Sequence, residues 1–436
     1  MTRRAILASQ VEPTPSVRNA LEARYRQVRA TTEWLRAPLE IEDLVPQSMP
    51  DCSPTKWHLA HTSWFFETFL LKPAGDARNV SDPKYAYLFN SYYNALGERI
   101  ERPRRGLLTR PTVAEVQRYR EAVDQRMLAL IDSADERELA RLAPLVELGL
   151  NHEQQHQELI LTDVKHLLGC NPLRPSYRGR SGVEEPTPGL KPSANSWVEF
   201  AGGLVSVGFE GDGFAFDNES PRHQVFLRPY RLSDRPVSNG DFLAFLEDGG
   251  YDRPEFWLSD GWAARLAQGW SAPSYWEKAD DGAWRIFTLD GMRALDLAEP
   301  VCHVSFYEAD AFARWSNARL PSEFEWEHAA STTSVEGNFL ETEAFHPRAR
   351  SGASSTPSQL FGDVWEWTAS PYLAYPGYRP LEGALGEYNG KFMCNQFVLR
   401  GGSCASPSSH LRATYRNFFP PDARWQFSGL RLAQDG

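Results

Sequence analysis

The chain has 436 residues, enough for two or three domains, and a formal net charge of −11. This acidic balance argues against non-specific nucleic-acid binding, which needs a basic surface. No run of eighteen apolar residues is present, and the first residues lack the apolar core of a signal peptide, so neither a membrane span nor export is expected. The five cysteines show no CxxC spacing, which predicts no disulfide framework and fits a cytoplasmic protein.

Four amphipathic stretches in the first 170 residues predict a helical bundle. Apolar residues recur at helical spacing over residues 16–35, 53–71, 112–131 and 138–168, and Ser16 and Ser53-Pro54 suit helix starts. Four long helices joined by loops are typical of a four-helix bundle. The connection over residues 72–111 is too long and irregular for a simple loop, so we expect it to have a function.

A segment rich in Pro, Gly and Ser, residues 171–196, predicts a linker. Beyond it lie short β-like runs at 198–200, 204–207 and 223–227, two expected helices at 305–315 and 322–330, and a final 110 residues that we expect to be mainly loops. We therefore predict an α+β, two-domain chain, with a helical bundle over residues 1–170, the linker over 171–196 and a second domain over 197–436.

His152 and His156 are the most informative pair of residues in the fourth predicted helix. Because they are four residues apart, both imidazoles lie on one helix face, where they continue the apolar stripe. Burying two imidazoles without a partner is costly. The pair therefore predicts a transition-metal site.

A third ligand is expected from a facing helix. His61 is the best candidate because it follows an inward-facing stripe, and His58, one turn away, competes with it. His166 is turned about 80° from His156 around the helix and is a poor ligand. Three histidines suit zinc and non-haem iron equally. The run His152 to His156 also has the HExxH form of zinc proteases, although no third ligand follows at the spacing of that class.

Six segments, taken together and in order, resemble one known family. They are Ser53 to His61, Asn90 to Asn94, His152 to Glu158, Gly362 to Trp367, Leu399 to Ser403 and Tyr415 to Asn417. Over nearly its whole length the chain is similar to the ergothioneine-biosynthesis sulfoxide synthases, iron(II) enzymes that join hercynine to a thiol using dioxygen. The resemblance implies a DinB-like four-helix bundle followed by a formylglycine-generating-enzyme-like domain with a C-type-lectin-like fold.

The resemblance also implies the metal and its ligands. His61, and not His58, would bind Fe(II) together with His152 and His156, between the two domains. Three neutral ligands leave the ion its Lewis acidity and free positions for a thiolate. The segments 362–367 and 399–403 would be scaffold, as would Cys394 and Cys404.

Substrate-binding roles follow by matching position. Gln155 would help to hold hercynine, Asn417 would hydrogen-bond its imidazole, and Phe418 would attract its trimethylammonium group. Family members that use γ-glutamylcysteine carry an Asp where this chain has Phe419, so free cysteine is the expected thiol donor. Arg99 and Arg102 would then grip the carboxylate of cysteine.

A proton donor is also needed, because the reduction of dioxygen consumes protons. In the cysteine-using branch this role falls to paired tyrosines. Tyr92 and Tyr93 lie in the long irregular connection, and we expect Tyr93 to act with Tyr92 as its neighbour.

The sequence thus predicts a non-haem iron, dioxygen-dependent enzyme that joins cysteine to C2 of the hercynine imidazole, with small-molecule partners and no nucleic-acid or membrane partner. Four alternatives stay open. One is a selenoneine synthase that uses a selenosugar. Another is an ovothiol-type enzyme, which couples cysteine to histidine but typically carries a C-terminal methyltransferase domain, for which a chain ending at Gly436 leaves no room. The others are a DinB-like zinc hydrolase or thiol transferase, and a non-catalytic binding protein.

Overall fold

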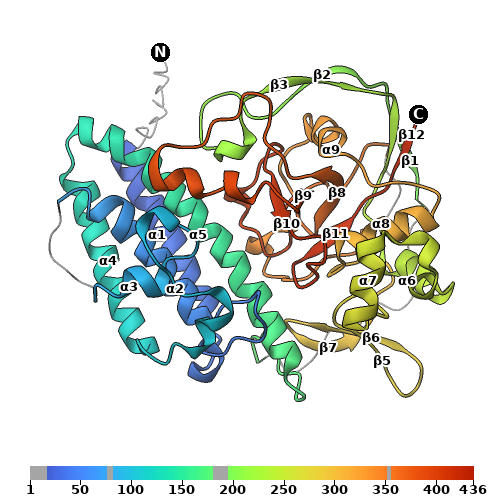
Figure 1. Cartoon of the computed structure of the whole chain (residues 1–436), viewed down its shortest axis with the longest axis horizontal. Helices are drawn as coiled ribbons and strands as arrows, with labels where there is room; N and C mark the ends of the chain where they lie inside the picture. The colour runs from blue at the N-terminus through green and yellow to red at the C-terminus, as the bar shows by residue number, and fades with distance from the viewer. Residues whose placement is uncertain (1–16, 76–81, 180–194, 351–354) are drawn as a thin grey trace, which may run out of the picture.

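The computed structural model describes residues 17–75, 82–179, 195–350 and 355–436. Its N-terminal part is a bundle of four long helices (Figure 1). They are α1 (Val17–Arg36), α2 (Thr55–Phe66), α4 (Val113–Ser133) and α5 (Glu136–Cys170), with the short α3 (Tyr85–Phe89) in the connection between α2 and α4. The predicted cap Ser16 and most of the predicted linker lie outside the described residues.

Capping residues fix where the long helices begin. Thr112 accepts a hydrogen bond from the backbone N–H of Glu115, whose carboxylate accepts from the N–H of Thr112 in return. Asp135 and Glu138 form the same reciprocal pair at the start of α5. At its C-terminal end, α2 continues into a π-helical turn, Glu67–Leu71. These starts agree with the helices expected from the sequence to within a few residues.

The C-terminal part combines small sheets with short helices. The strands are β1 (Trp197–Phe200), β2 (Gly203–Val207), β3 (His223–Leu227), β4 (Tyr230–Ser233), β5 (Trp276–Lys278), β6 (Trp284–Thr288), β7 (Gly291–Ala294), β8 (Trp365–Pro371), β9 (Phe397–Arg400), β10 (Asn417–Phe419), β11 (Ser428–Leu430) and β12 (Ala433–Asp435). The helices are α6 (Asn239–Glu247), α7 (Ser259–Gln268), α8 (Phe306–Trp315) and α9 (Glu323–Ala330). The strands pair in the orders β1-β4-β12, β10-β9-β8-β11, β2-β3 and β5-β6-β7.

The described part of the last 110 residues consists mainly of loops, as expected, but five short strands that the sequence did not reveal, β8 to β12, also lie there. Four of these five strands have only three or four residues, too few to show a two-residue period. In β8 the pairing with β9 shifts register between Trp367 and Pro371, which breaks the alternation further.

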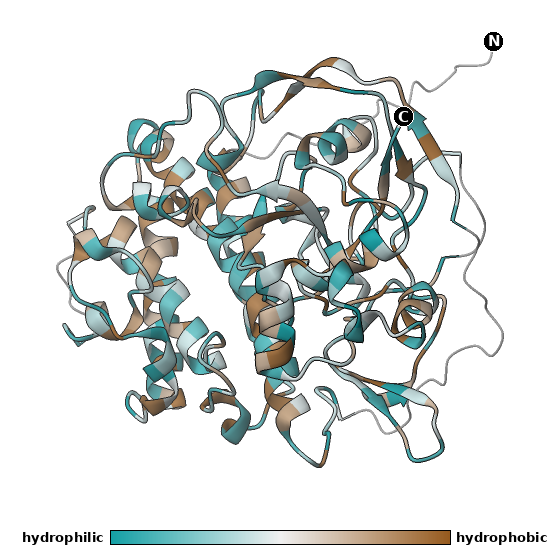
Figure 2. Ribbon diagram, turned by 45° about the vertical axis from the view of Figure 1, so that its right-hand side comes forward, coloured by the Kyte–Doolittle hydropathy of each residue, from teal (hydrophilic) through white to brown (hydrophobic). Residues whose placement is uncertain are grey.

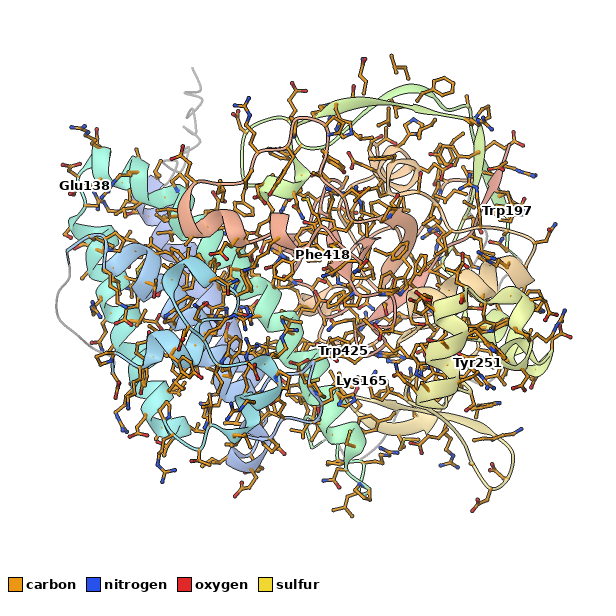
Figure 3. All side chains as sticks on the ribbon, in the orientation of Figure 1. Glu138, Lys165, Trp197, Tyr251, Phe418 and Trp425 are labelled. Atoms are coloured by element: carbon orange, nitrogen blue, oxygen red, sulfur yellow. The ribbon has the colours of Figure 1, made fainter. Side chains whose placement is uncertain are left out.

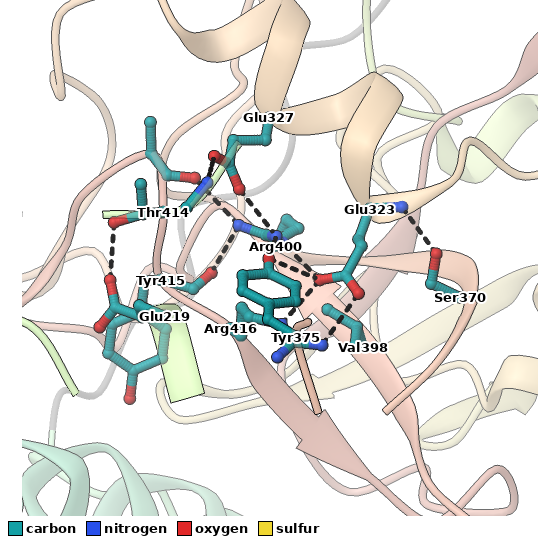
Figure 4. A network of polar contacts seen from close by, with 12 residues as sticks. Glu219, Glu323, Glu327, Ser370, Tyr375, Val398, Arg400, Thr414, Tyr415 and Arg416 are labelled. Carbon is teal, nitrogen blue, oxygen red and sulfur yellow. Dashed lines mark hydrogen bonds and ion pairs between the residues drawn. The ribbon is translucent and has the colours of Figure 1, made fainter. Parts of the chain in front are cut away.

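A buried network of charges anchors the strands that approach the bundle (Figure 4). Arg400, at the end of β9, donates to Glu323 (2.8 Å) and Glu327 (3.0 Å) of α9. Arg416, directly before β10, donates to both oxygens of Glu323 (2.8 and 2.9 Å). Because every member is buried and paired, the network fixes the position of Asn417, the next residue.

Helix α5 runs between the bundle and the C-terminal domain (Figure 1), with hydrophilic and hydrophobic positions along its length (Figure 2). Buried Glu158 connects the two parts: it accepts hydrogen bonds from Trp365 Nε1 (2.8 Å), Ser403 Oγ (2.5 Å) and Ser406 Oγ (2.7 Å). Helix α5 therefore contacts the C-terminal domain as well as α1 and α2 of the bundle. Among the described residues, no helix is both long enough and apolar enough to cross a membrane.

Candidate metal centre and substrate cavity

Three histidines from two facing helices meet in the bundle. His61 lies on α2, His152 and His156 lie one turn apart on α5, and one ligand nitrogen of each is within 4.8 Å of the others. The Nε2 atoms of His61 and His152 are 3.1 Å apart. Two nitrogens bound to one ion at right angles, each at a distance of about 2.1 Å, would be about 3.0 Å apart. The donor set and its spacing therefore fit a shared transition-metal ion.

The surroundings keep the three imidazoles neutral, as metal ligation requires. Burial lowers the pKa of His152 to about 3, and burial and the neighbouring histidines lower the pKa of His61 and His156 well below the usual value. His61 contacts the carbonyl oxygen of Phe89 through Nδ1 (2.5 Å) and stacks on Trp57 at 4.5 Å between ring centroids. Since only Nδ1–H can donate to that carbonyl, Nε2 is left free to bind a metal.

The two other histidines weighed as ligands lie outside this triad. His58 lies on the far side of His156, with 2.7 Å between the two Nδ1 atoms. His166 contacts the hydroxyl of Ser48 (2.7 Å). The structure thus brings together the three histidines singled out from the sequence.

Glu153, the acid of the HExxH form, is engaged by the bundle instead of the triad. Its carboxylate accepts from Arg29 (2.8 Å), Arg120 (2.6 Å) and Thr32 (2.6 Å), on α1 and α4. Burial alone would raise its pKa, but Arg120, Arg29 and these hydrogen bonds lower the pKa to about 2. A carboxylate held by two guanidinium groups is not available as a general base, which argues against the zinc-protease alternative.

A cavity of about 300 Å³ opens beside the triad, between the two domains. His152 and His156 form part of its wall. Figure 3 shows Phe418 and Trp425 of the C-terminal domain near α5 at this boundary. Other residues of the wall are Asp51, Ser53, Trp57, His58, Ser91, Tyr92, Arg102, Arg105, Gln155, Glu158, Asp163, Trp365, Tyr388, Phe392, Tyr415, Asn417 and Phe419.

Two arginines reach the cavity, and they are not the pair expected. Arg102 and Arg105 line it, whereas Arg99 does not. Buried Arg105 donates to Ser53 Oγ (2.9 Å) and Ser91 Oγ (3.1 Å) and lies 3.4 Å from the centre of the Trp57 ring. The ion pairs between described residues include none for Arg105. Burial and the neighbouring Arg102 and Arg99 lower its pKa, and the charge of Asp163 offsets this only in part.

The paired tyrosines divide into one residue at the wall and one behind it. Tyr92 lines the cavity, and Tyr93 packs behind it against Tyr92, Trp64 and Phe69, with ring centroids 4.6 to 5.8 Å apart. Tyr93 is fully buried, and burial raises its pKa well above the usual value. Of the two, Tyr92 is therefore the one exposed to a bound substrate.

Tyr388 is a further phenol at the wall, and no motif in the sequence singles it out. Its hydroxyl donates to the side-chain oxygen of Gln155, whose nitrogen donates to Tyr415 (2.8 Å). Its ring is 5.6 Å from that of His152 and 6.0 Å from that of Tyr92. Tyr388 lies 233 residues from Gln155 along the chain, so only the fold reveals their contact.

The remaining predicted residues line the far side of the cavity. Asn417 and Phe418 begin β10, and Phe418 stacks on Tyr372 with ring centroids 4.0 Å apart. Phe419 meets Trp425 edge to face at 6.0 Å. Trp365 belongs to a segment expected to be scaffold, yet its side chain also forms part of the wall.

Comparisons with known proteins agree with this architecture. The DinB superfamily profile matches residues 24–160, and the sulfatase-modifying factor enzyme 1-like domain matches residues 183–359 and 358–436. The predicted fold class, a DinB-like bundle followed by a formylglycine-generating-enzyme-like domain, is thereby confirmed. The domain limits expected at residues 170 and 197 stay a prediction.

Individual relatives cover most of the chain. The chain is 32% identical over 423 residues to the hercynine oxygenase of Mycolicibacterium smegmatis, covering 90% of this chain and 94% of that protein. It is 32% identical over 464 residues to the hercynine oxygenase of Mycolicibacterium thermoresistibile, covering 96% and 94%. The formylglycine-generating enzyme of Streptomyces coelicolor is 28% identical over 304 residues and covers 58% of this chain and 94% of its own length. With its bundle, its second domain and these relatives, the chain belongs to the hercynine oxygenase family.

Proposed function

We propose that this protein is an iron(II)- and dioxygen-dependent sulfoxide synthase that forms a bond between the sulfur of cysteine and C2 of the hercynine imidazole. The observation that carries the proposal is the position of the triad: His152 and His156 lie in the wall of a cavity that also holds arginines and an aromatic cluster. The two Mycolicibacterium relatives are named hercynine oxygenases, and a further relative in Schizosaccharomyces pombe is named an ergothioneine biosynthesis protein.

The proposed reaction balances without a further reductant. Hercynine gives up the hydrogen on C2, cysteine gives up its thiol hydrogen, and a carbon–sulfur bond forms, which is a two-electron oxidation. Adding one oxygen atom to the sulfur removes two more electrons. Dioxygen takes up all four electrons: one of its atoms becomes the sulfoxide oxygen, and the other leaves as water with the two hydrogens.

His61, His152 and His156 would hold the metal. Three imidazoles suit Fe(II) by ligand type, and they leave positions open for other ligands. When bound, the iron would supply the Lewis acidity and the redox chemistry needed to activate a thiolate and dioxygen. The described residues add no carboxylate to this triad, so the three protein ligands themselves carry no charge.

The thiol donor would bind through Arg102 and Arg105. The Arg105 guanidinium is buried and forms no ion pair with a described residue, and the carboxylate of cysteine would supply a bidentate partner. Phe419 offers no carboxylate for the amino group that γ-glutamylcysteine would bring. This supports free cysteine as the donor.

Hercynine would occupy the side of the cavity formed by the C-terminal domain. Gln155 and Asn417 offer amide groups for its imidazole. Phe418, Phe419 and Trp425 offer ring surface for its trimethylammonium group, which attracts aromatic faces.

A phenol of the wall would deliver the proton. Tyr92 lies at the wall, where burial raises its pKa, so the hydroxyl stays protonated until it donates. Tyr93, packed behind it, would position the Tyr92 ring, and the hydroxyl of Tyr93 would be a second proton donor.

The direct test is to incubate the Fe(II)-loaded protein in air with hercynine and cysteine and to analyse the products by mass spectrometry. We expect the sulfoxide adduct of the two substrates. Parallel incubations replace hercynine by histidine, or cysteine by γ-glutamylcysteine or a selenosugar, and so test the ovothiol-type and selenoneine alternatives. Failure to form an adduct with any of these pairs would overturn the proposal.

A further inference from the structure

His58 is buried beside the triad, and the proposed reaction assigns no role to it. Its Nδ1 is 2.7 Å from the Nδ1 of His156, and its Nε2 is 3.1 Å from Oδ2 of Asp163. The same Asp163 oxygen accepts the backbone N–H of Ser53 at 2.8 Å. His58, Asp163 and Ser53 are all less than 9% exposed, so water does not compete for these contacts.

For a neutral His58, these contacts fit one arrangement of hydrogens, which follows from which atoms can donate and which can only accept. An ionised carboxylate only accepts, so the hydrogen of His58 lies on Nε2 and points to Asp163. The Nδ1 of His58 is then an acceptor, and the hydrogen between the two rings belongs to Nδ1 of His156. The lone pair of His156 is therefore on Nε2, the nitrogen left for the triad.

We propose that His58 and Asp163 are positioning residues of the metal centre. They hold His156 in the tautomer and the ring orientation that present Nε2 to the metal, and neither binds the metal itself. The inference rests on the proposed metal centre and adds to it a side-chain support for one ligand. Because Ser53 lies two residues before α2 and Asp163 lies on α5, the support also fixes the two ligand-bearing helices against each other.

The three ligands differ in how they are supported. The Nδ1 of His61 contacts the backbone carbonyl of Phe89, and a substitution of Phe89 would leave that carbonyl in place. His152 Nδ1 has no hydrogen-bond partner among the described residues. Among the three, His156 alone has an outer partner that is a side chain, so its support can be removed by mutation.

The experiment is a titration of the metal-free full-length protein with Co²⁺, followed by the visible absorption bands of the bound ion. Replacing His58 by Phe removes both contacts, and we expect Co²⁺ to bind 10- to 100-fold more weakly with shifted bands. His58→Asn places an amide oxygen where Nδ1 lay and should restore part of the affinity. His166→Asn is the matched control, because it changes a histidine of α5 that contacts Ser48 and not the triad; we expect wild-type affinity.

Each outcome bears on the inference. If His58→Phe folds and binds Co²⁺ within twofold of the wild type, the positioning role is wrong. If it loses Co²⁺ binding altogether while His61→Ala keeps it, His58 is itself a ligand and the inference is also overturned. If His58→Phe does not fold, the near-isosteric Asp163→Asn variant decides, with weaker binding and shifted bands expected. A wild-type protein that binds no Co²⁺ contradicts the proposed metal centre itself.

Discussion

Replacing Glu153 by Gln separates a structural carboxylate from a catalytic one. In a zinc protease the acid of the HExxH form is a general base, and its loss would abolish the reaction while leaving the fold intact. Here the carboxylate pairs with Arg29 and Arg120 inside the bundle. We therefore expect Glu153→Gln to lower stability and to leave metal binding and chemistry largely unchanged.

The expected loss of stability in Glu153→Gln can be estimated from the ion pairs of this carboxylate. The pKa of Glu153 falls from 4.5 to about 2, which corresponds to about 3 kcal/mol in favour of the ionised form. Removing one partner of a buried ion pair costs a similar 3–5 kcal/mol, since the remaining charges stay buried. Because the folded-state pKa is lowered, this stabilisation is present above about pH 4.5 and is lost as the pH falls towards 2.

The assay is urea unfolding of the metal-free protein at pH 7, followed by far-ultraviolet circular dichroism, which reports mainly on the helices. Glu147→Gln is the matched control on the same helix. Its pair with Arg24 is short, at 2.6 Å, but both side chains are 32% exposed, so the loss should stay below about 1 kcal/mol. If Glu153→Gln were as stable as Glu147→Gln and inactive, the structural account of this residue would be refuted.

Three further predictions concern the cavity and the triad. Arg105→Lys should raise KM for cysteine about 10- to 100-fold with little change in kcat, because an ammonium group cannot pair bidentately with a carboxylate. The control is Arg104→Lys, at an exposed position, and equal KM values for the two variants would exclude Arg105 from the cysteine site. Tyr92→Phe should lower kcat about 100-fold and leave cysteine binding intact, measured by steady-state oxygen uptake; an unchanged kcat would assign the proton to another group. Burial lowers the pKa of His152 from 6.5 to about 3, so between these pH values the unfolded chain binds a proton that the folded chain does not bind. The metal-free protein should therefore lose stability as the pH falls from about 6.5 towards 3. Melting temperatures that stay constant over this range would contradict the burial of a neutral imidazole.

The triad was accessible from the sequence because helical geometry is regular. The spacing of His152 and His156 fixes their relative direction once a helix is assumed. The choice between His61 and His58 was not open to the same argument, since both follow the buried stripe of α2 and all twelve of its residues are buried. The packing of α2 against α5 places His61 in the triad and His58 outside it, as the resemblance to the family implied.

The substrate side of the cavity was less accessible because irregular segments carry no period. In residues 94–107 two short 3₁₀ turns decide which arginines face inward, so Arg105 reaches the wall and Arg99 does not. Tyr388 and Trp365 come from loop and strand segments, and each lies more than 200 residues along the chain from its hydrogen-bond partner on α5. No local pattern in the sequence brings such residues together, and the resemblance to a family pointed to Gln155 and Asn417 but to neither Arg105 nor Tyr388.

The most direct test of the metal centre and its reaction is product formation under ¹⁸O₂ by the Fe(II)-loaded wild type and by His61→Ala. We predict a sulfoxide adduct of hercynine and cysteine that carries one ¹⁸O atom with the wild type, and no adduct with the variant. An adduct without ¹⁸O, or equal amounts from both proteins, would contradict the account.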